Sequence, residues 1–193
     1  MLPQIVFATN NAHKLKEARE LTEGIMKVLS LADIGCHDDI PETASTLEGN
    51  ALIKAKWVKE RYGYDCFADD TGLMVDALNG EPGVYSARYA GEHCSPQDNM
   101  DLLLSKMEGI ADRKAHFATV IALVSDGEEH LFRGEVEGEI ALVPKGVNGF
   151  GYDPVFIARE SGLTFAEMQP EDKNHISHRG RAMAKLINYL STK

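Results

Sequence analysis

Residues 115–143, AHFATVIALVSDGEEHLFRGEVEGEIALV, contain two long β-like runs on either side of Asp126-Gly127. Ala115–Ser125 and Leu131–Val143 each carry several valine, isoleucine and leucine residues, which is typical of strands. An Asp-Gly pair between two such runs is a strong signal for a β-hairpin. Because the two strands of a hairpin are antiparallel, this segment argues against an all-parallel sheet and predicts a mixed one.

Strand-like and helix-like patterns alternate along the rest of the chain. Gln4–Ala8 is a short apolar run that predicts a buried strand. Ser45-Thr46-Leu47-Glu48 matches a capping box, so a helix is expected from there to about Tyr62, with Gly63 placed to end it. Because the chain has no repeat, linker or low-complexity segment, residues 1–193 are predicted to form one α/β domain. Further helices are expected over residues 12–23, 95–107 and 177–190, and further strands over 66–68 and 155–158.

The composition is that of a folded protein, since 44% of the 193 residues are hydrophobic and 26% are charged. The net charge of -10 argues against a protein that binds nucleic acid through a basic face, although a local cluster of cations can still bind a small polyphosphate. No apolar stretch is long enough to span a bilayer and the N-terminus lacks a signal-peptide pattern, so a cytoplasmic protein is expected. The odd number and wide spacing of the cysteines predict reduced thiols at Cys36, Cys66 and Cys94.

The first candidate site follows the first expected strand. A helix N-terminus presents unpaired N–H groups and a partial positive charge, which suits a phosphate. Here the turn adds hydrogen-bonding side chains and a lysine, and the segment lacks the Walker A pattern. The alternative is an ordinary asparagine-capped helix with a solvated lysine. The candidate phosphate-binding residues are Thr9, Asn10, Asn11, Ala12, His13 and Lys14.

The second candidate site is Asp69-Asp70-Thr71-Gly72, which is expected at the end of a strand. Adjacent carboxylates repel each other, and a bound cation compensates this repulsion. Paired acids of this kind are suited to holding magnesium against a polyphosphate. Glu42, just after Pro41, is a candidate third carboxylate. The alternative interpretation is an Asp-rich turn that binds nothing.

Two further segments carry side chains suited to a nucleobase. Gly149-Phe150-Gly151-Tyr152-Asp153-Pro154 places two aromatic rings and a carboxylate among glycines, which suits stacking and hydrogen bonding to a base. Lys173–Arg179 gathers basic side chains at the start of the last expected helix, where they oppose the helix dipole and suggest an anionic or carbonyl-bearing ligand. The alternatives are a glycine loop with its aromatic rings in the core, and an ordinary polar loop that begins a helix.

Taken together, five segments resemble the inosine triphosphate pyrophosphatase family, the enzymes that cleave non-canonical purine nucleoside triphosphates. They occur in the family's order and span nearly the whole chain. One departure is Gly49, which lies within the family's usual Glu-Asn-Ala pattern, and another is Asn10, where many members have a small residue. The segments are ATNNAHKLKE at 8–17, EGNALIKAK at 48–56, FADDTGLMVDALNGEPGVYSARYAG at 67–91, GFGYDPVF at 149–156 and FAEMQPEDKNHISHRGRA at 165–182.

The resemblance implies an elongated α/β fold, with a mixed sheet and flanking helices in two lobes around a nucleotide-binding cleft. It also implies a homodimer and a magnesium cofactor. Glu42 and Asp70 would hold the magnesium, with Asp70 also acting as the base and Asp69 in support. Lys54 would join residues 9–14 at the phosphates, and Thr71 would contact the substrate. The residues that would hold the base are Phe150, Gly151, Tyr152, Asp153, Lys173, His178 and Arg179.

The expected reaction is hydrolysis of ITP, dITP or XTP to the monophosphate and pyrophosphate, with Asp70 taking a proton from the attacking water. Arg179 or Lys173 would donate to the 6-carbonyl of the base and would meet the 6-amino group of adenine unfavourably. The alternative for Arg179 is a surface residue paired with Glu171 or Asp172. Two rival functions are a house-cleaning pyrophosphatase for other modified nucleotides and a nucleotide-binding regulator without turnover. The paired acids argue against the regulator.

Overall fold

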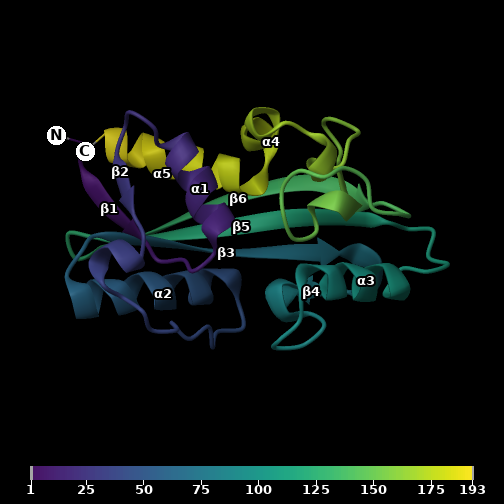
Figure 1. Ribbon diagram of the computed structural model, residues 1–193, viewed down its shortest axis with the longest axis horizontal. Helices are drawn as coiled ribbons and strands as arrows, with labels where there is room; N and C mark the ends of the chain where they lie inside the picture. Colours follow the sequence, from purple (N-terminus) through teal and green to yellow (C-terminus); the bar gives the residue numbers. More distant parts are fainter. Residues whose placement is uncertain (1, 193) are drawn as a thin grey trace. The chain divides into compact units, whose positions relative to one another are not determined.

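The computed structural model describes residues 2–192, which divide into two compact units. Unit 1 comprises residues 2–70, 119–134 and 179–192, and unit 2 comprises residues 71–118 and 135–178. Each unit is therefore assembled from stretches that are far apart in the sequence, as the colours in Figure 1 show. Among the described residues, no helix combines the length and apolar character needed to cross a membrane.

The sheet is mixed, as the sequence predicts. Its strand order is β2-β1-β3-β5-β6-β7, and β4 pairs with β3 outside this path. β1 pairs in parallel with β2 and β3, whereas the β3–β4 and β6–β7 pairs are antiparallel. The strands are β1 Gln4–Phe7, β2 Lys27–Leu29, β3 Cys66–Val75, β4 Pro82–Gly83, β5 Lys114–Ser125, β6 Glu128–Ile140 and β7 Phe156–Ala158.

The predicted hairpin joins β5 to β6. Asp126 and Gly127 both have positive φ, 53° and 79°, which is the backbone conformation of the two-residue turn that matches strand twist. β6 begins and ends three residues before the expected Leu131–Val143, so Leu142 and Val143 lie outside it and are exposed. The sequence pattern therefore predicted the strand but placed both of its ends three residues too late in the chain.

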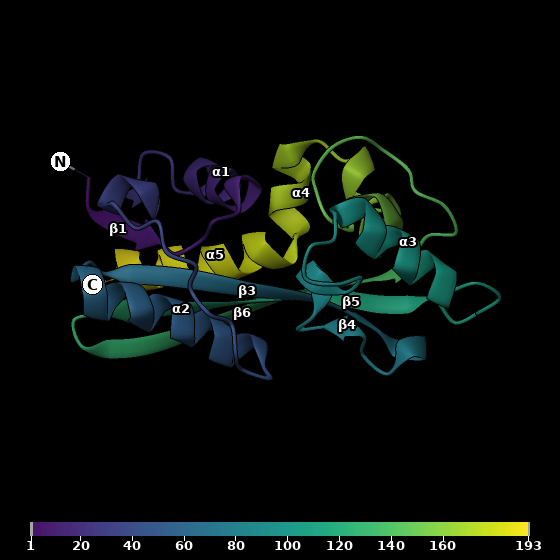
Figure 2. The same ribbon diagram turned by 60° about the horizontal axis from the view of Figure 1, so that its bottom comes forward.

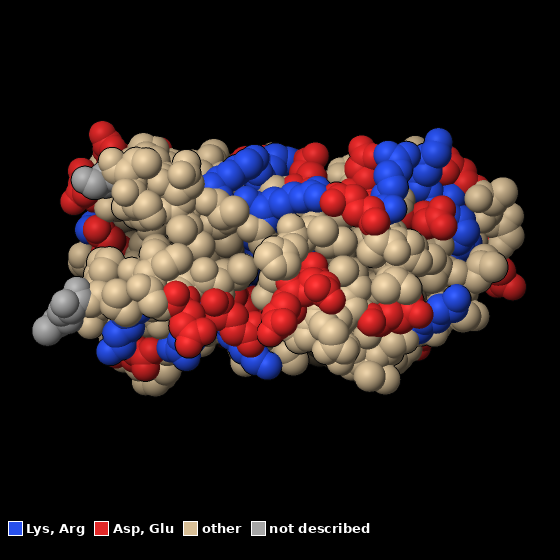
Figure 3. All heavy atoms as spheres, turned by 90° about the horizontal axis from the view of Figure 1, so that it is seen from above, with Lys and Arg blue, Asp and Glu red and all other residues tan. Residues whose placement is uncertain are grey.

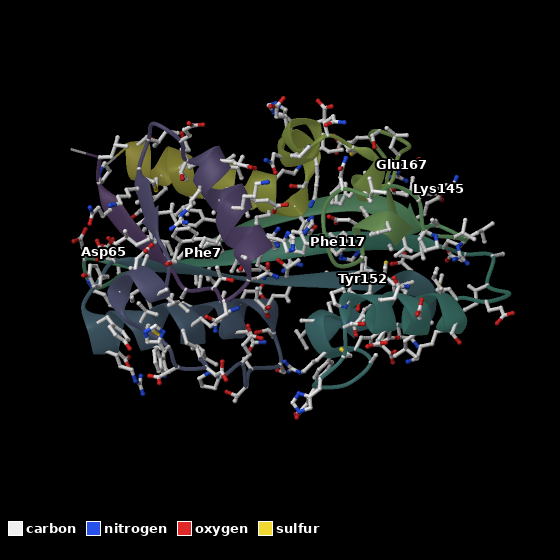
Figure 4. All side chains as sticks on the ribbon, in the orientation of Figure 1. Phe7, Asp65, Phe117, Lys145, Tyr152 and Glu167 are labelled. Carbon is white, nitrogen blue, oxygen red and sulfur yellow. The ribbon has the colours of Figure 1, made fainter. Side chains whose placement is uncertain are left out.

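In unit 1, alternate residues of each strand bury their side chains on opposite faces of the sheet. Phe7 and Phe67 pack with the apolar residues of α1 and α5, whereas Ala68 and Val6 pack with those of α2. This follows from the two-residue side-chain period of a strand. Figures 1 and 2 show α2 along one face of these strands and α1 on the other, and Figure 4 labels Phe7 between them. The helices of unit 1 are α1 Ala12–Leu21, α2 Leu47–Tyr62 and α5 His178–Ser191.

The ends of α2 show which local predictions were sound. Gly63 ends the helix with a φ of 77°, as expected. The predicted capping box is wrong by one residue, because Thr46, rather than Ser45, accepts the hydrogen bond from Gly49 N at 3.0 Å. The three cysteines are free thiols, as predicted.

Unit 2 has one core, built from β3, β5, β6, α3 and the segment between β6 and α4. Phe117 packs edge-on against Phe156 with ring centroids 4.7 Å apart, and Tyr152 is buried in the same cluster (Figure 4). Ser95 caps α3 in a reciprocal capping box with Asp98. The sequence did not predict α4, which occupies part of the expected polar loop before α5. The helices of unit 2 are α3 Pro96–Lys106 and α4 Pro170–Ile176, with short 3-10 helices in the chain at Ala32–Ile34, Asp76–Leu78, Ser86–Arg88, Asp153–Val155 and Phe165–Glu167.

Candidate active site

Asp69 and Asp70 lie inside β3, not at a strand end or in a turn as the sequence suggested. The strand period continues through them, so Asp69 lies on the face of Phe67, toward α1 and α5. Asp70 lies on the face of Ala68, toward α2. Both carboxylates are buried, with residue exposures of 1% and 7%. The two acids are therefore placed in separate surroundings rather than repelling each other within one turn.

Asp69 is surrounded by cations from α1 and α5. Lys14 Nζ donates to Asp69 Oδ1 at 3.1 Å, and Arg179 Nε donates to Asp69 Oδ2 at 3.2 Å. Burial alone would raise the pKa of this carboxyl. The cations of Lys14, Arg179 and Lys54 nevertheless hold it well below its usual range, so Asp69 is a stable anion and not a proton acceptor near neutral pH.

Arg179 is not the surface residue of the alternative interpretation. The residue is 2% exposed, and Nη1 donates to Glu17 Oε2 at 2.5 Å while Nε contacts Asp69. Its ion-pair partners are thus acids of unit 1, rather than Glu171 or Asp172. Glu17 was missed in the sequence, although it lies one turn after Lys14 on the same helix and can share its face.

The turn before α1 combines both interpretations of its sequence. Asn11 caps α1, and its Oδ1 accepts hydrogen bonds from His13 N at 3.0 Å and Lys14 N at 3.2 Å. Thr9 Oγ1 accepts from Asn11 N at 3.1 Å. Lys14, however, is not a solvated lysine, because burial lowers its pKa and its ammonium group pairs with Asp69. Asn10, Ala12 and His13 are exposed.

On the opposite face of β3, α2 places Asn50 and Lys54 beside the second acid. Asn50 Nδ2 donates to Asp70 Oδ2 at 3.1 Å. Lys54 Nζ donates to Glu42 Oε1 at 2.5 Å and to the backbone carbonyl of Asp69 at 2.6 Å. Burial acts to lower the pKa of Lys54, but the carboxylates of Asp69, Glu42 and Asp70 have a larger effect in the opposite direction. The pKa is therefore raised above its usual value, and the group stays a cation.

Asp70 differs from Asp69 in its proton affinity. Burial, with a further contribution from the charge of Glu42, raises the pKa of Asp70 to about 6, even though Lys54 acts in the opposite direction. A carboxylate with this pKa can exchange a proton near neutral pH. Asp70 is therefore the better candidate for a general base of the two aspartates.

Glu42 and Asp70 fit a magnesium ion by the chemistry of their donors. Both offer carboxylate oxygens, and the two residues are close enough that the charge of Glu42 raises the pKa of Asp70. Within residues 2–192, no group of three or more metal-ligating side chains occurs. Magnesium in phosphate-transfer sites is held by one or two carboxylates, with water and substrate phosphate completing the shell. A site of two protein carboxylates matches that pattern.

Unit 2 holds the second group of predicted residues. Lys173 Nζ donates to Asp153 Oδ2 at 2.7 Å, and both residues are 4% exposed. The same oxygen accepts from Phe150 N at 2.9 Å, and the Lys173 ammonium lies 5.0 Å from the Phe150 ring centroid. Gly149 has a φ of 74°, and a Cβ there would clash with Asp153. The glycine thus allows the loop to close on its own aspartate.

The aromatic residues of this loop have different environments. Tyr152 is buried in the core, and its hydroxyl donates to the backbone carbonyl of Ser86 at 2.7 Å. The sequence interpretation that Tyr152 contacts a base is therefore not supported by its side chain, and the alternative of an aromatic ring in the core holds for this residue. Phe150 is partly exposed and is the ring of this loop that can stack on a ligand.

His178 lies flat on Phe117, with ring centroids 4.5 Å apart and an interplanar angle of 11°. Phe165 stacks nearby at 5.9 Å from His178. The imidazole plane is therefore fixed by two core phenylalanines. Phe117 was not singled out in the sequence, because it is one apolar residue in a strand full of apolar residues.

The chain is similar over nearly its whole length to known proteins of one family. A model of the Ham1 family matches residues 5–189. Two similar proteins are the dITP/XTP pyrophosphatases of Flavobacterium johnsoniae, 53% identical over 97% of this chain and 98% of its own, and of Porphyromonas gingivalis, 53% identical over 98% of each. Among solved structures, the Ham1 protein of Staphylococcus aureus has a TM-score of 0.88 at 40% identity over 98% of both chains. A HAM1 protein from Coxiella burnetii has a TM-score of 0.91 at 39% identity over 100% of both.

Proposed function

Since the chain belongs to the Ham1 family, we propose that it is a pyrophosphatase that hydrolyses ITP, dITP and XTP to the monophosphate and pyrophosphate. The observation that carries this proposal is the pair of buried acids on β3. Asp69 pairs with cations that hold its pKa well below the usual range, whereas the pKa of Asp70, beside Glu42, is raised to about 6. The similar proteins named as dITP/XTP pyrophosphatases supply the substrate class.

In unit 1, Glu42 and Asp70 would hold magnesium, which when bound neutralises phosphate charge and favours attack at the α-phosphorus. Asp70 would accept a proton from the attacking water, for which its raised pKa is suited. Asp69 would keep Lys14 and Arg179 in place through its two ion pairs. The chain's own contribution is thus a fixed arrangement of charges formed before the substrate arrives.

The phosphates would bind at the N-terminus of α1 and at two lysines. Lys54 is buried and Lys14 is partly exposed, and the present partners of both ammonium groups are carboxylates or a backbone carbonyl. A polyphosphate offers such ammonium groups additional anionic oxygens. Asn10, Ala12 and His13 are exposed around the N-terminus of α1, which adds the positive end of the helix dipole.

In unit 2, Phe150 would stack on the base and the buried Lys173 would donate to a 6-carbonyl. Lysine has only donors, so a 6-amino group would meet it unfavourably. His178, held flat by Phe117, would contribute a ring nitrogen. Contacts of Thr71, Gly151 and Arg179 with substrate stay predictions, as do the homodimer and the cytoplasmic location.

A substrate panel tests the proposal. We expect pyrophosphate release from ITP, XTP and dITP, much slower release from ATP and GTP, and none after chelation of magnesium. Faster release from modified pyrimidine nucleotides would favour the rival house-cleaning enzyme, and nucleotide binding without turnover would favour the regulator. A nucleic-acid binder is disfavoured by the net charge of -10, and Figure 3 shows acidic side chains interspersed with basic ones on the face it draws.

A further inference from the structure

Asn50 is fully buried on α2, and its amide joins two segments that each carry an acid. Asn50 Oδ1 accepts a hydrogen bond from Ala44 N at 2.9 Å, two residues after Glu42. Asn50 Nδ2 donates to Asp70 Oδ2 at 3.1 Å. One side chain therefore connects the loop of Glu42 to the carboxylate of Asp70.

The orientation of this amide is fixed by its partners. A backbone N–H can only donate, so the amide oxygen has to face Ala44. A carboxylate can only accept when ionised, so the amide NH2 has to face Asp70. Rotating the amide by 180° would break both hydrogen bonds, and the contact is consequently specific for asparagine rather than for any polar residue of similar size.

Lys54, one helical turn after Asn50, makes a second connection of the same kind. Its ammonium group bridges Glu42 Oε1 and the backbone carbonyl of Asp69. The loop also packs closely on the first turn of α2, since a Cβ added to Gly49 would lie only 2.6 Å from Ala44 Cβ. Two bridges and one tight contact thus set the position of Glu42 relative to β3.

Asn50 is not needed to begin the helix. Thr46 already caps α2 by accepting the hydrogen bond from Gly49 N. The residue is instead fully buried, and its amide connects the Glu42 loop to β3 through its two hydrogen bonds. Burial of an amide is costly unless its hydrogen bonds are made, and here they are made to the two segments that carry the proposed metal ligands.

We propose that Asn50 is a positioning residue for the magnesium site, which holds the Glu42 loop next to the Asp70 carboxylate so that both acids can bind one divalent cation. This inference rests on the proposed function for the identity of the two ligands. Residues that orient metal ligands without touching the metal typically change metal affinity about 10–100-fold when they are removed.

The experiment measures Mn²⁺ binding by electron paramagnetic resonance, in the presence of a non-hydrolysable α,β-methylene analogue of ITP. We expect Asn50→Ala to weaken Mn²⁺ binding about 10–100-fold. In turnover assays, the magnesium concentration for half-maximal rate should rise by a similar factor, and kcat should recover largely at saturating magnesium. Thermal unfolding checks that the variant is folded, and Asn50→Ser replaces it if it is not.

Asn99 provides a matched control in unit 2. It is also a buried asparagine on a helix, and its amide makes two hydrogen bonds as well, both to backbone groups, accepting from Ala90 N at 2.8 Å and donating to Ala87 O at 3.2 Å. Neither partner is an acid. Asn99→Ala should reduce stability by a similar amount and leave Mn²⁺ affinity unchanged.

Unaltered Mn²⁺ affinity in a folded Asn50 variant would overturn the inference, as would an equal loss in Asn99→Ala. Absence of Mn²⁺ binding in the wild-type protein would overturn it as well. Failure of the proposed function is a separate result, because wild-type protein that releases no pyrophosphate from any nucleotide can still show Asn50-dependent Mn²⁺ binding.

Discussion

Two adjacent aspartates acquire opposite properties because a strand alternates its side chains. Asp69 faces cations from α1 and α5, which keep its pKa well below the usual range. Asp70 faces Asn50 and the Glu42 loop, where burial raises its pKa to about 6. The residue pattern alone shows the pair, and only the family resemblance assigned different roles to its members, since their properties depend on which helix covers each face of the strand.

Asp70→Asn should nearly abolish turnover while leaving the protein folded. The substitution keeps the shape of the side chain and removes both a proposed proton acceptor and a metal ligand. Loss of a general base alone costs about 100-fold or more in kcat. Pyrophosphate release from ITP at saturating magnesium measures the effect. A folded Asp70→Asn protein with turnover near that of the wild type would show that Asp70 is not the base.

Stability should depend on pH through Asp70. Its pKa rises from near 4 in the unfolded chain to about 6 in the folded one, so the folded state binds more protons between these values. Stability therefore falls as pH rises from about 4 to about 6, by about 1–3 kcal/mol. The pKa of Asp69 is lowered in the fold, so protonation of Asp69 changes the stability only at pH values below this window.

Urea unfolding in EDTA across this pH range measures the slope that Asp70 contributes. Asp70→Asn has no titrating group at this position, and its stability should change less over the same window. Identical pH profiles for the two proteins would mean that Asp70 has an ordinary pKa in the metal-free fold.

Arg179→Ala should destabilise the protein by about 3–5 kcal/mol, because the carboxylates of Asp69 and Glu17 lose a buried cation. Arg133→Ala is the control in unit 1, since the pair of Arg133 with Glu48 is exposed and worth about 0–1 kcal/mol. Urea unfolding compares the two variants. A loss no larger than that of Arg133→Ala would place Arg179 outside the stabilising network. The ratio of catalytic efficiencies for ITP and ATP tests its predicted contact with the base independently.

Among the elements, an arginine stabilises the junction of α3 with the end of β6. Arg113 donates to the carbonyls of Ile140 at 2.6 Å, Ala141 at 2.9 Å and Met107 at 3.0 Å. Hydrogen bonds from a charged donor contribute more than neutral ones, so Arg113→Ala should lower the free energy of unfolding by about 2–4 kcal/mol. Arg159→Ala removes an exposed pair with Glu137 and should cost less than about 1 kcal/mol. Equal denaturation midpoints for the two variants would contradict this account.

Element types were predictable where the local pattern and the tertiary environment agree. β1, α1, α2, α3 and the β5–β6 hairpin were all found within a few residues of their expected bounds. β3 was expected to stop before Asp69, because Asp, Thr and Gly are common in turns and rare in strands. Pairing within the sheet and the cations on both faces override that local preference, so one ten-residue strand runs through the site.

The sequence predicted which residues belong to the candidate site, but not which of them contact one another. Asp70 and Glu42 were candidates from the residues themselves, whereas the phosphate-binding role of Lys54 came only from the family resemblance. The roles of Asn50 and Glu17 depend on contacts across 20 and 162 positions of sequence. No local pattern contains contacts of that range.

At the scale of the whole molecule, the boundaries between the two units fall within regular elements. The chain passes from one unit to the other inside β3, β5 and β6, and after the first residue of α5. A strand or helix that is broken at such a point loses backbone hydrogen bonds in both parts. The prediction of one domain over residues 1–193 therefore becomes a prediction of one cooperative unfolding transition.

Trp57 makes this prediction measurable, because it is the single tryptophan of the chain and lies on α2 in unit 1, packed against that unit's core. Arg113 lies in unit 2. If the units unfold together, Arg113→Ala should shift the Trp57 fluorescence transition and the circular dichroism transition to the same lower urea midpoint. If they unfold separately, the fluorescence midpoint should stay at its wild-type value while only part of the dichroism signal moves. We expect coincident shifts, since independent unfolding would require β3, β5 and β6 each to break within its length. Non-coincident transitions would refute the single cooperative domain.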